Sequence, residues 1–157
     1  MFQVIVDADA CPRNCLQIIQ KLADTYQYQV VTVASFNHRI DNPIHLIVGD
    51  ESQAADIAVI NRTQPGDIVV TQDWGLAAMV LAKQAQALSP QGQIFEAGQM
   101  NSLLEERHLL AEYRRSGGRA KGPTKRTWND DERFMESFIR ALKDRKPAIP
   151  YCNGGWG

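Results

Sequence analysis

The chain has 157 residues, of which 17 are basic and 18 are acidic, and its net charge is −1. This length suits one domain with a substantial core, and the balanced charge indicates no particular partner. No apolar run is long enough to cross a membrane, and no signal-peptide pattern is present. We therefore expect a cytoplasmic protein without a membrane partner. Its oligomeric state is not specified by the sequence.

The apolar pattern predicts strands that alternate with helices. Strands are expected at residues 4–6, 30–34, 46–48, 67–71 and 93–96. Helices are expected at residues 13–26, 52–62, 75–88, 101–115 and 130–143. Such alternation indicates βαβ units with a parallel sheet. We predict one α/β domain over residues 1–146, with helices flanking a mostly parallel central sheet, and a flexible tail over residues 147–157.

The most informative pattern is a pair of acidic residues between a strand and a helix. Asp7 and Asp9 follow the β-branched run of residues 4–6, and Pro12 suits the first turn of a helix. Side chains two apart on a strand share a face and lie roughly 6–7 Å apart. Like charges that close require a proton, a cationic side chain or a metal. Alternatively, one carboxylate caps the helix and the other is a solvated turn residue.

Other acidic residues are expected near the same edge of the sheet. Asp73 follows the strand at 67–71, and a parallel sheet brings the carboxyl ends of its strands to one edge. Asp50 and Glu51 follow the strand at 46–48. Asp56 has only apolar neighbours, which predicts a helix buried on more than one side; the alternative is a solvated face or an ion pair. Asp67 begins its strand at the opposite edge, as a turn residue would.

A cluster made only of carboxylates selects hard cations such as Mg²⁺ or Mn²⁺. Two such ions can activate a water and stabilise the leaving oxygen in phosphodiester cleavage. The candidate metal ligands are Asp7, Asp9, Asp56 and Asp73. The sequence contains no Ser-His-Asp candidate, Gly-rich phosphate fingerprint or His-rich metal motif that would indicate other chemistry.

A basic, glycine-containing loop is expected at residues 114–127, followed by Trp128. Its cations are Arg114, Arg115, Arg119, Lys121, Lys125 and Arg126, and no acidic residue interrupts them. Such a loop beside an acidic edge would bind the phosphates of RNA or single-stranded DNA, and an aromatic residue could stack on a base. The alternative is a solvated loop.

The three cysteines have no disulfide-framework spacing, which is typical of a reducing compartment. They are Cys11, Cys15 and Cys152. Cys11 stands at a helix start, where the pKa of a thiol is lowered, so it could be reactive. Alternatively, Cys11 and Cys15 are small apolar packing residues.

The motif Asp-Ala-Asp-Ala-Cys-Pro at residues 7–12 resembles the signature of the bacterial YaiI/YqxD family. The resemblance extends over nearly the whole chain, through Ala55-Asp56, residues 66–71 and the glycines at 117–123. That family is grouped with PIN-like folds, which are similar to flap nucleases and toxin ribonucleases. The resemblance implies a three-layer domain with a metal-binding acidic edge.

The PIN-like pattern implies roles for particular residues. It places catalytic acids at Asp7, Asp56 and Asp73, with Thr71 in support. Asp9 belongs to the YaiI/YqxD family's own motif. A further helix acid of PIN domains has its nearest candidate in Glu51.

Three functions are compatible with these patterns. The first is a metal-dependent phosphodiesterase acting on RNA or single-stranded DNA. The second is a module of the same fold that binds nucleic acid without cutting it. The third is a haloacid-dehalogenase-like phosphatase, because apolar-Asp-x-Asp also opens that group. In that group Gly-Thr usually follows the second Asp, whereas this chain has Ala10-Cys11.

Overall fold

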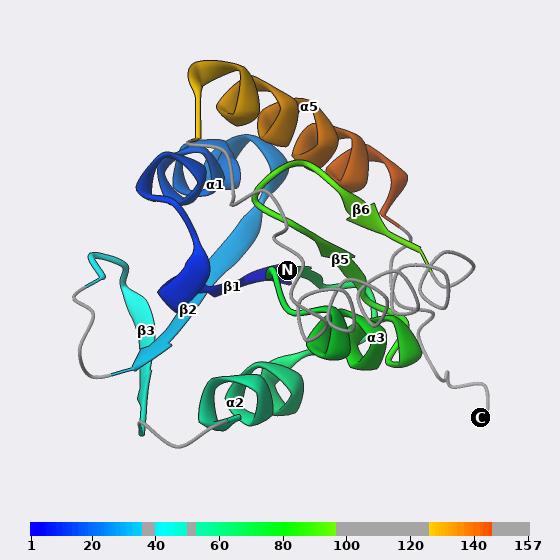
Figure 1. Cartoon of the computed structure of the whole chain (residues 1–157). Coiled ribbons are helices and arrows are strands. Elements are labelled where there is room, and N and C mark those ends of the chain that lie inside the picture. Colours follow the sequence, from blue (N-terminus) through cyan, green and yellow to red (C-terminus); the bar gives the residue numbers. More distant parts are fainter. Residues whose placement is uncertain (36–39, 50–52, 97–125, 146–157) are drawn as a thin grey trace, which may run out of the picture.

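A six-stranded sheet forms the centre of the computed structural model, which describes residues 1–35, 40–49, 53–96 and 126–145 (Figure 1). Its strand order is β3-β2-β1-β4-β5-β6. The strands are β1 (Phe2–Asp7), β2 (Tyr28–Ser35), β3 (Ile44–Val48), β4 (Ile68–Val70), β5 (Gln86–Leu88) and β6 (Ile94–Phe95). Strands β1 to β5 are parallel, and β6 runs antiparallel to β5. The expected α/β fold with a mostly parallel sheet is confirmed.

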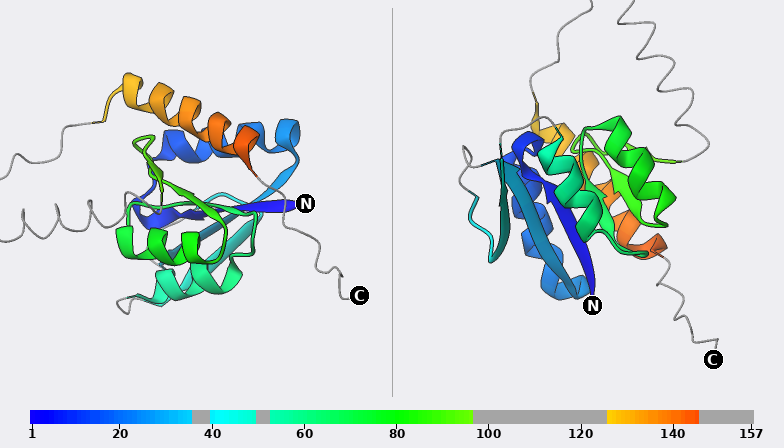
Figure 2. Two further views of the ribbon diagram at one scale, coloured as in Figure 1. Left: turned by 90° about the vertical axis from the view of Figure 1, so that its right-hand side faces the viewer. Right: turned by 90° about the horizontal axis from the view of Figure 1, so that it is seen from below.

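Helices cover both faces of this sheet, which gives three layers (Figure 2). One face is covered by α1 (Arg13–Tyr26) and α5 (Trp128–Asp144), and the other by α2 (Ala54–Arg62) and α3 (Trp74–Ala82). A short 3₁₀ turn, η1 (Ala8–Ala10), joins β1 to the segment before α1. No helix in the described ranges is long and apolar enough to cross a membrane.

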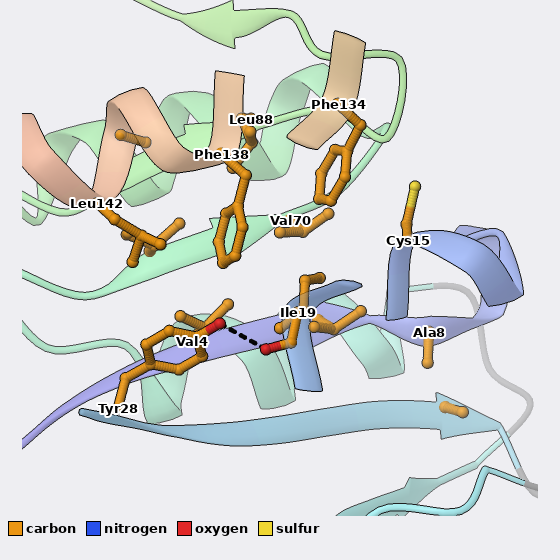
Figure 3. Close-up of a cluster of buried hydrophobic side chains, with 14 residues drawn as sticks. Val4, Ala8, Cys15, Ile19, Tyr28, Val70, Leu88, Phe134, Phe138 and Leu142 are labelled. Atoms are coloured by element: carbon orange, nitrogen blue, oxygen red, sulfur yellow. Dashed lines mark hydrogen bonds between the residues drawn. The ribbon is translucent and has the colours of Figure 1, made fainter. Parts of the chain in front are cut away.

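Aromatic side chains fix α5 onto the first face (Figure 3). Phe134 and Phe138 are fully buried and stack with their ring centroids 5.6 Å apart. Tyr28 meets the edge of Phe138, and its hydroxyl donates a hydrogen bond to the carbonyl of Ile19 in α1. Burying each phenylalanine contributes about 1.5–3 kcal/mol. The start of α5, and Arg126 just before it, is therefore held against the start of α1.

The predicted helix at 75–88 is wrong over its second half. Helix α3 ends at Ala82, and Gln84 takes the left-handed conformation with φ 67°. Residues Gln86–Leu88 instead form β5, which pairs with β4 on one side and β6 on the other. Ala87 and Leu88 are buried in the sheet. Burial between two strands outweighs the high helix propensity of the alanine, glutamine and leucine residues in this segment.

The other described elements lie close to their predicted positions. The strands expected at 4–6, 30–34, 46–48 and 93–96 and the helices expected at 13–26 and 130–143 are present. Helix α2 begins after Gln53, which adopts φ 78°. The expected capping residue Ser52, the helix expected at 101–115 and the tail at 147–157 lie outside the described residues.

Candidate functional site

The acidic residues gather where the strand order of the sheet reverses. From β1 the chain passes to β2 and β3 on one side, then returns through α2 to β4 on the other side of β1. Ligands of open α/β sheets bind at such a switch point, outside the carboxyl ends of the strands. Asp7 is the last residue of β1, and Thr71 directly follows β4. These two residues therefore lie at the position where this fold binds ligands.

Thr71 links two of the predicted site residues. Its hydroxyl donates a hydrogen bond to Oδ2 of Asp7 at 3.1 Å and accepts one from the backbone N–H of Asp73 at 3.0 Å. Asp73 caps α3, because its Oδ1 accepts the backbone N–H of Leu76 at 3.1 Å. Thr71 is buried. One buried hydroxyl group thus joins the carboxylate of Asp7 to the backbone of Asp73.

The carboxyl group of Asp7 is electrostatically strained. Burial raises its pKa from 3.8 to about 6, although the hydrogen bond from Thr71 lowers it. The neighbouring carboxylates of Asp56, Asp9 and Asp73 contribute smaller parts of this rise. Within the described part of the chain, no lysine or arginine forms an ion pair with Asp7. The predicted repulsion among these acids is therefore present.

Asp56 lies in the first turn of α2, opposite Asp73. The prediction that its helix is buried on more than one side is wrong. Val59 is buried, but Ile57 is 56% exposed and Asp56 is half-buried. Burial raises the pKa of Asp56, as do the charge of Asp73 and a side-chain hydrogen bond with it. The two carboxyl groups therefore form a pair that joins α2 to α3.

This acidic pair lies on an open groove of about 810 Å³. The groove is also lined by Ile57, Ile60 and Met79. Ile57 and Met79 are large apolar side chains exposed to solvent, Met79 to 45%. The groove thus combines negative charge with an apolar wall. Sequence reasoning missed this wall, although Ile57 directly follows Asp56 in α2.

Asp9 does not occupy the predicted geometry. It lies in η1 rather than in the strand, so it does not share a strand face with Asp7. Its two carboxylate oxygens accept the backbone N–H of Ser35 at 3.1 and 3.0 Å, and the hydroxyl of Ser35 also donates to it. Asp9 therefore ties η1 to the end of β2. Because both of its oxygens accept these bonds, Asp9 is not among the metal ligands that we propose.

The donor set decides which kind of metal site is feasible. Within the described residues, no three His, Cys, Asp or Glu side chains lie close enough together to hold a metal ion. A closed site built from all four predicted aspartates is therefore not formed. Asp56 and Asp73 do interact directly. Mg²⁺ is often held by one or two carboxylates, with waters and a substrate phosphate completing its shell. The pair fits that open kind of site.

Arg126 is the one member of the predicted basic set among the described residues. Its Nε is 2.7 Å from Oδ1 of Asp131, its Nη1 donates to the carbonyl of Pro90 at 2.8 Å, and its Nη2 donates to Sγ of Cys15 at 2.9 Å. These contacts engage the whole guanidinium group within the protein. The remaining predicted phosphate ligands, Arg114, Arg115, Arg119, Lys121 and Lys125, lie outside the described residues.

Asp67 has the structural role that its position predicted. It is 3% exposed at the edge of the sheet opposite Asp7. It accepts hydrogen bonds from the backbone and side chain of Gln3 and from the backbone N–H of Gln64. It therefore holds the turn that precedes β4. Asp50 and Glu51 lie outside the described residues.

Comparison with known proteins identifies relatives over most of the chain. The family model described as "Uncharacterized BCR, YaiI/YqxD family" matches residues 5–144. A UPF0178 protein of Heliobacterium modesticaldum is 48% identical over 142 residues, which cover 90% of this chain and 97% of the relative. UPF0178 proteins of Exiguobacterium sibiricum and Clostridium kluyveri are 40% and 38% identical, covering 91% and 92% of this chain and 98% and 95% of the relatives. No solved structure matches the chain.

Proposed function

The chain belongs to the uncharacterised YaiI/YqxD family, and we propose that it is a PIN-like phosphodiesterase that uses Mg²⁺ or Mn²⁺ to cleave RNA or single-stranded DNA. The observation that carries this proposal is the pairing of Asp56 with Asp73 beside Asp7 at the switch point of the sheet. These two acidic side chains are in contact, and no cationic side chain forms an ion pair with them in the described part of the chain. A bound cation would therefore relieve the repulsion between their ionised forms.

Each residue of the site has a distinct role in this proposal. Asp56 and Asp73 would hold the cation, and the N-cap position of Asp73 keeps its second oxygen free of the helix. A bound cation would lower the pKa of a water and neutralise charge at the leaving oxygen. Asp7 would accept the proton of the attacking water, because its pKa of about 6 keeps it ionised near neutral pH yet basic. Thr71 would hold Asp7 in place.

The groove supports a nucleic-acid substrate. A nucleotide has a phosphate that a cation can bind and an apolar base that can pack on aliphatic side chains. The acidic pair and the wall formed by Ile57 and Met79 lie on one groove and could receive these two parts. The five cations from Arg114 to Lys125 would bind flanking phosphates.

Cleavage of labelled single-stranded RNA and DNA with Mn²⁺ tests the proposal. Asp56→Asn should abolish activity, because it removes half of the acidic pair. Asp24→Asn is the matched control, since Asp24 is exposed on α1, on the other side of the sheet. Both variants are purified in parallel with the wild type, so that activity from a contaminating nuclease would be seen in all three preparations. Activity that persists in Asp56→Asn, or is absent from the wild type, contradicts catalysis.

The same fold could bind nucleic acid without cutting it, and one observation favours this second function. No three-ligand metal group occurs within the described residues. Salt-sensitive binding without cleavage would support it. Each phosphate contact on a single strand contributes about 0.7 to the slope of log affinity against log salt. Replacing Arg119 and Lys121 with glutamine should flatten that slope, and an unchanged slope would place the contact elsewhere.

A further inference from the structure

A second cluster of reactive groups lies at the start of α1, and the proposed function does not use it. Cys15 is fully buried, and Nη2 of Arg126 donates to its Sγ at 2.9 Å. The other nitrogens of this guanidinium are bound to Asp131 and to the carbonyl of Pro90. The guanidinium is therefore aimed at the sulfur by two further contacts. Sγ of Cys15 also lies 3.5 Å from the carbonyl of Pro90, to which a protonated thiol could donate. The contact with Arg126 is much shorter, and since a neutral thiol is only a weak acceptor, that contact suits a thiolate.

Cys11 completes the cluster four residues earlier, where η1 ends. The lowered pKa expected for Cys11 from its place at a helix start is wrong, because the contact with Cys15, burial and the charge of Asp7 raise the pKa of this thiol, so Cys11 needs Cys15 as its base. The side chains of the two cysteines interact directly, and this contact is the largest cause that lowers the pKa of Cys15. Burial raises that pKa, the charge of Arg126 lowers it, and Asp131 on α5 raises it. The charged groups that face Cys15 thus come from the segment before α5 and from α5 itself. Their balance favours ionisation of Cys15.

Only Cys11 of the pair is accessible to a small molecule. It is partly buried, whereas Cys15 is fully buried. Cys11 lines an open hollow of about 570 Å³, together with Arg13 and Gln17 from α1. Hollows of a few hundred cubic ångströms accept small organic molecules. Arg13 on one hand, and Asp9 and Asp41 on the other, suit a molecule that carries both carboxylate and ammonium groups. A reactant could therefore reach Cys11 from solvent, whereas Cys15 is buried and in contact with Cys11.

We propose that Cys11 and Cys15 are a redox-active dithiol that a low-molecular-weight disulfide oxidises to an intramolecular disulfide. Cys11 passes its proton to the Cys15 thiolate and attacks one sulfur of the small disulfide. A mixed disulfide forms on Cys11, and the released thiolate takes the proton back from Cys15. The Cys15 thiolate then attacks Sγ of Cys11, and the second small thiolate leaves. Two electrons pass from the protein to the small disulfide, which is reduced to two thiols.

Oxidation has a structural consequence in this arrangement. The disulfide removes the negative charge that Cys15 presents to Arg126, which then keeps Asp131 and Pro90 as its partners among the described residues. The contact that joins α1 to the segment before α5 is weakened. That segment continues directly from the basic residues at 114–125.

The dithiol is tested on the full chain with Cys152 replaced by serine, so that only Cys11 and Cys15 remain. The protein is equilibrated with oxidised glutathione, quenched with acid, alkylated and weighed by mass spectrometry. We expect an intramolecular disulfide. Adding Cys15→Ser should leave glutathione trapped on Cys11, because no resolving thiol remains, and adding Cys11→Ser should leave Cys15 unmodified. A parent protein that forms no internal disulfide, or that keeps glutathione without resolving it, overturns the proposal.

The role of Arg126 has a separate readout in the pH dependence of disulfide formation. In Arg126→Gln, the pH midpoint of the rate should rise by about one unit or more, because a cation beside the thiolate is lost. Arg133→Gln is the matched control, since Arg133 is an exposed arginine of α5. Arg126→Lys keeps the positive charge and should retain most of the wild-type pH profile. This variant tests the effect of the charge if Arg126→Gln does not fold. Two results would overturn this role of Arg126. One is a midpoint in Arg126→Lys that is about one unit or more above that of the wild type. The other is a folded Arg126→Gln with the same midpoint as the wild type.

Discussion

Replacing Asp7 with asparagine should make the protein more stable at neutral pH when no metal is present. The pKa of Asp7 is raised from 3.8 to about 6, mainly by burial. A difference of roughly two pKa units corresponds to about 3 kcal/mol between the protonated and ionised forms. Asparagine has the shape of the carboxyl group and does not ionise. It therefore removes this cost while it can still accept the hydrogen bond from Thr71.

The sign of the pH dependence follows from the direction of the shift. Because the folded state binds the proton of Asp7 more tightly than the unfolded state does, this residue favours folding fully below pH 3.8. That contribution is lost as the pH rises through about 6. The free energy of unfolding of the wild type, minus that of Asp7→Asn, should fall by up to about 3 kcal/mol between acid and mildly alkaline pH.

Urea unfolding of both proteins in chelator, at a series of pH values across this range, measures the difference. Asp24→Asn is the control, because Asp24 is exposed and far from the acidic pair. A difference that does not change with pH would refute the reasoning, since it would show that Asp7 ionises without cost. A variant that becomes less stable than the wild type as the pH rises would show that the ionised carboxylate is a structural hydrogen-bond acceptor. Saturating Mn²⁺ should reduce the advantage of the variant.

Three further substitutions should change the free energy of unfolding in urea. Thr71→Val should lower it by about 1–3 kcal/mol, because Asp7 loses its buried donor; an unchanged value would show that the linkage is not stabilising. Asp67→Ala should cost about 2–4 kcal/mol by leaving three donors without an acceptor, yet leave any Mn²⁺-induced rise in melting temperature unchanged. Gly92→Ala should cost about 1–3 kcal/mol, since φ is +90° and a Cβ would lie 2.8 Å from the carbonyl oxygen of Arg133. An unchanged free energy of unfolding in Asp67→Ala or in Gly92→Ala would contradict the contacts described for that residue.

Local patterns in the sequence were sufficient for the framework of the site. A β-branched run followed by an acid and a helix start predicted both β1 with Asp7 and β4 with Asp73. Both predictions depend on short-range rules, because apolar strands are buried and parallel strands end at one edge. The structural role of Asp67 was predictable for the same reason, from the Pro-Gly turn before it.

Only the tertiary structure decided where particular side chains are directed. Asp9 turns to the backbone of Ser35, and Arg126 reaches Cys15 across 111 positions of sequence. Residues 86–88 become a strand because β4 and β6 stand on either side of them. In each case at least one partner lies outside the local segment, and its contacts outweigh a local preference of about 1 kcal/mol or less per residue. Sequence patterns carry that local preference, whereas the competing contacts exist only once the sheet and its helices have packed.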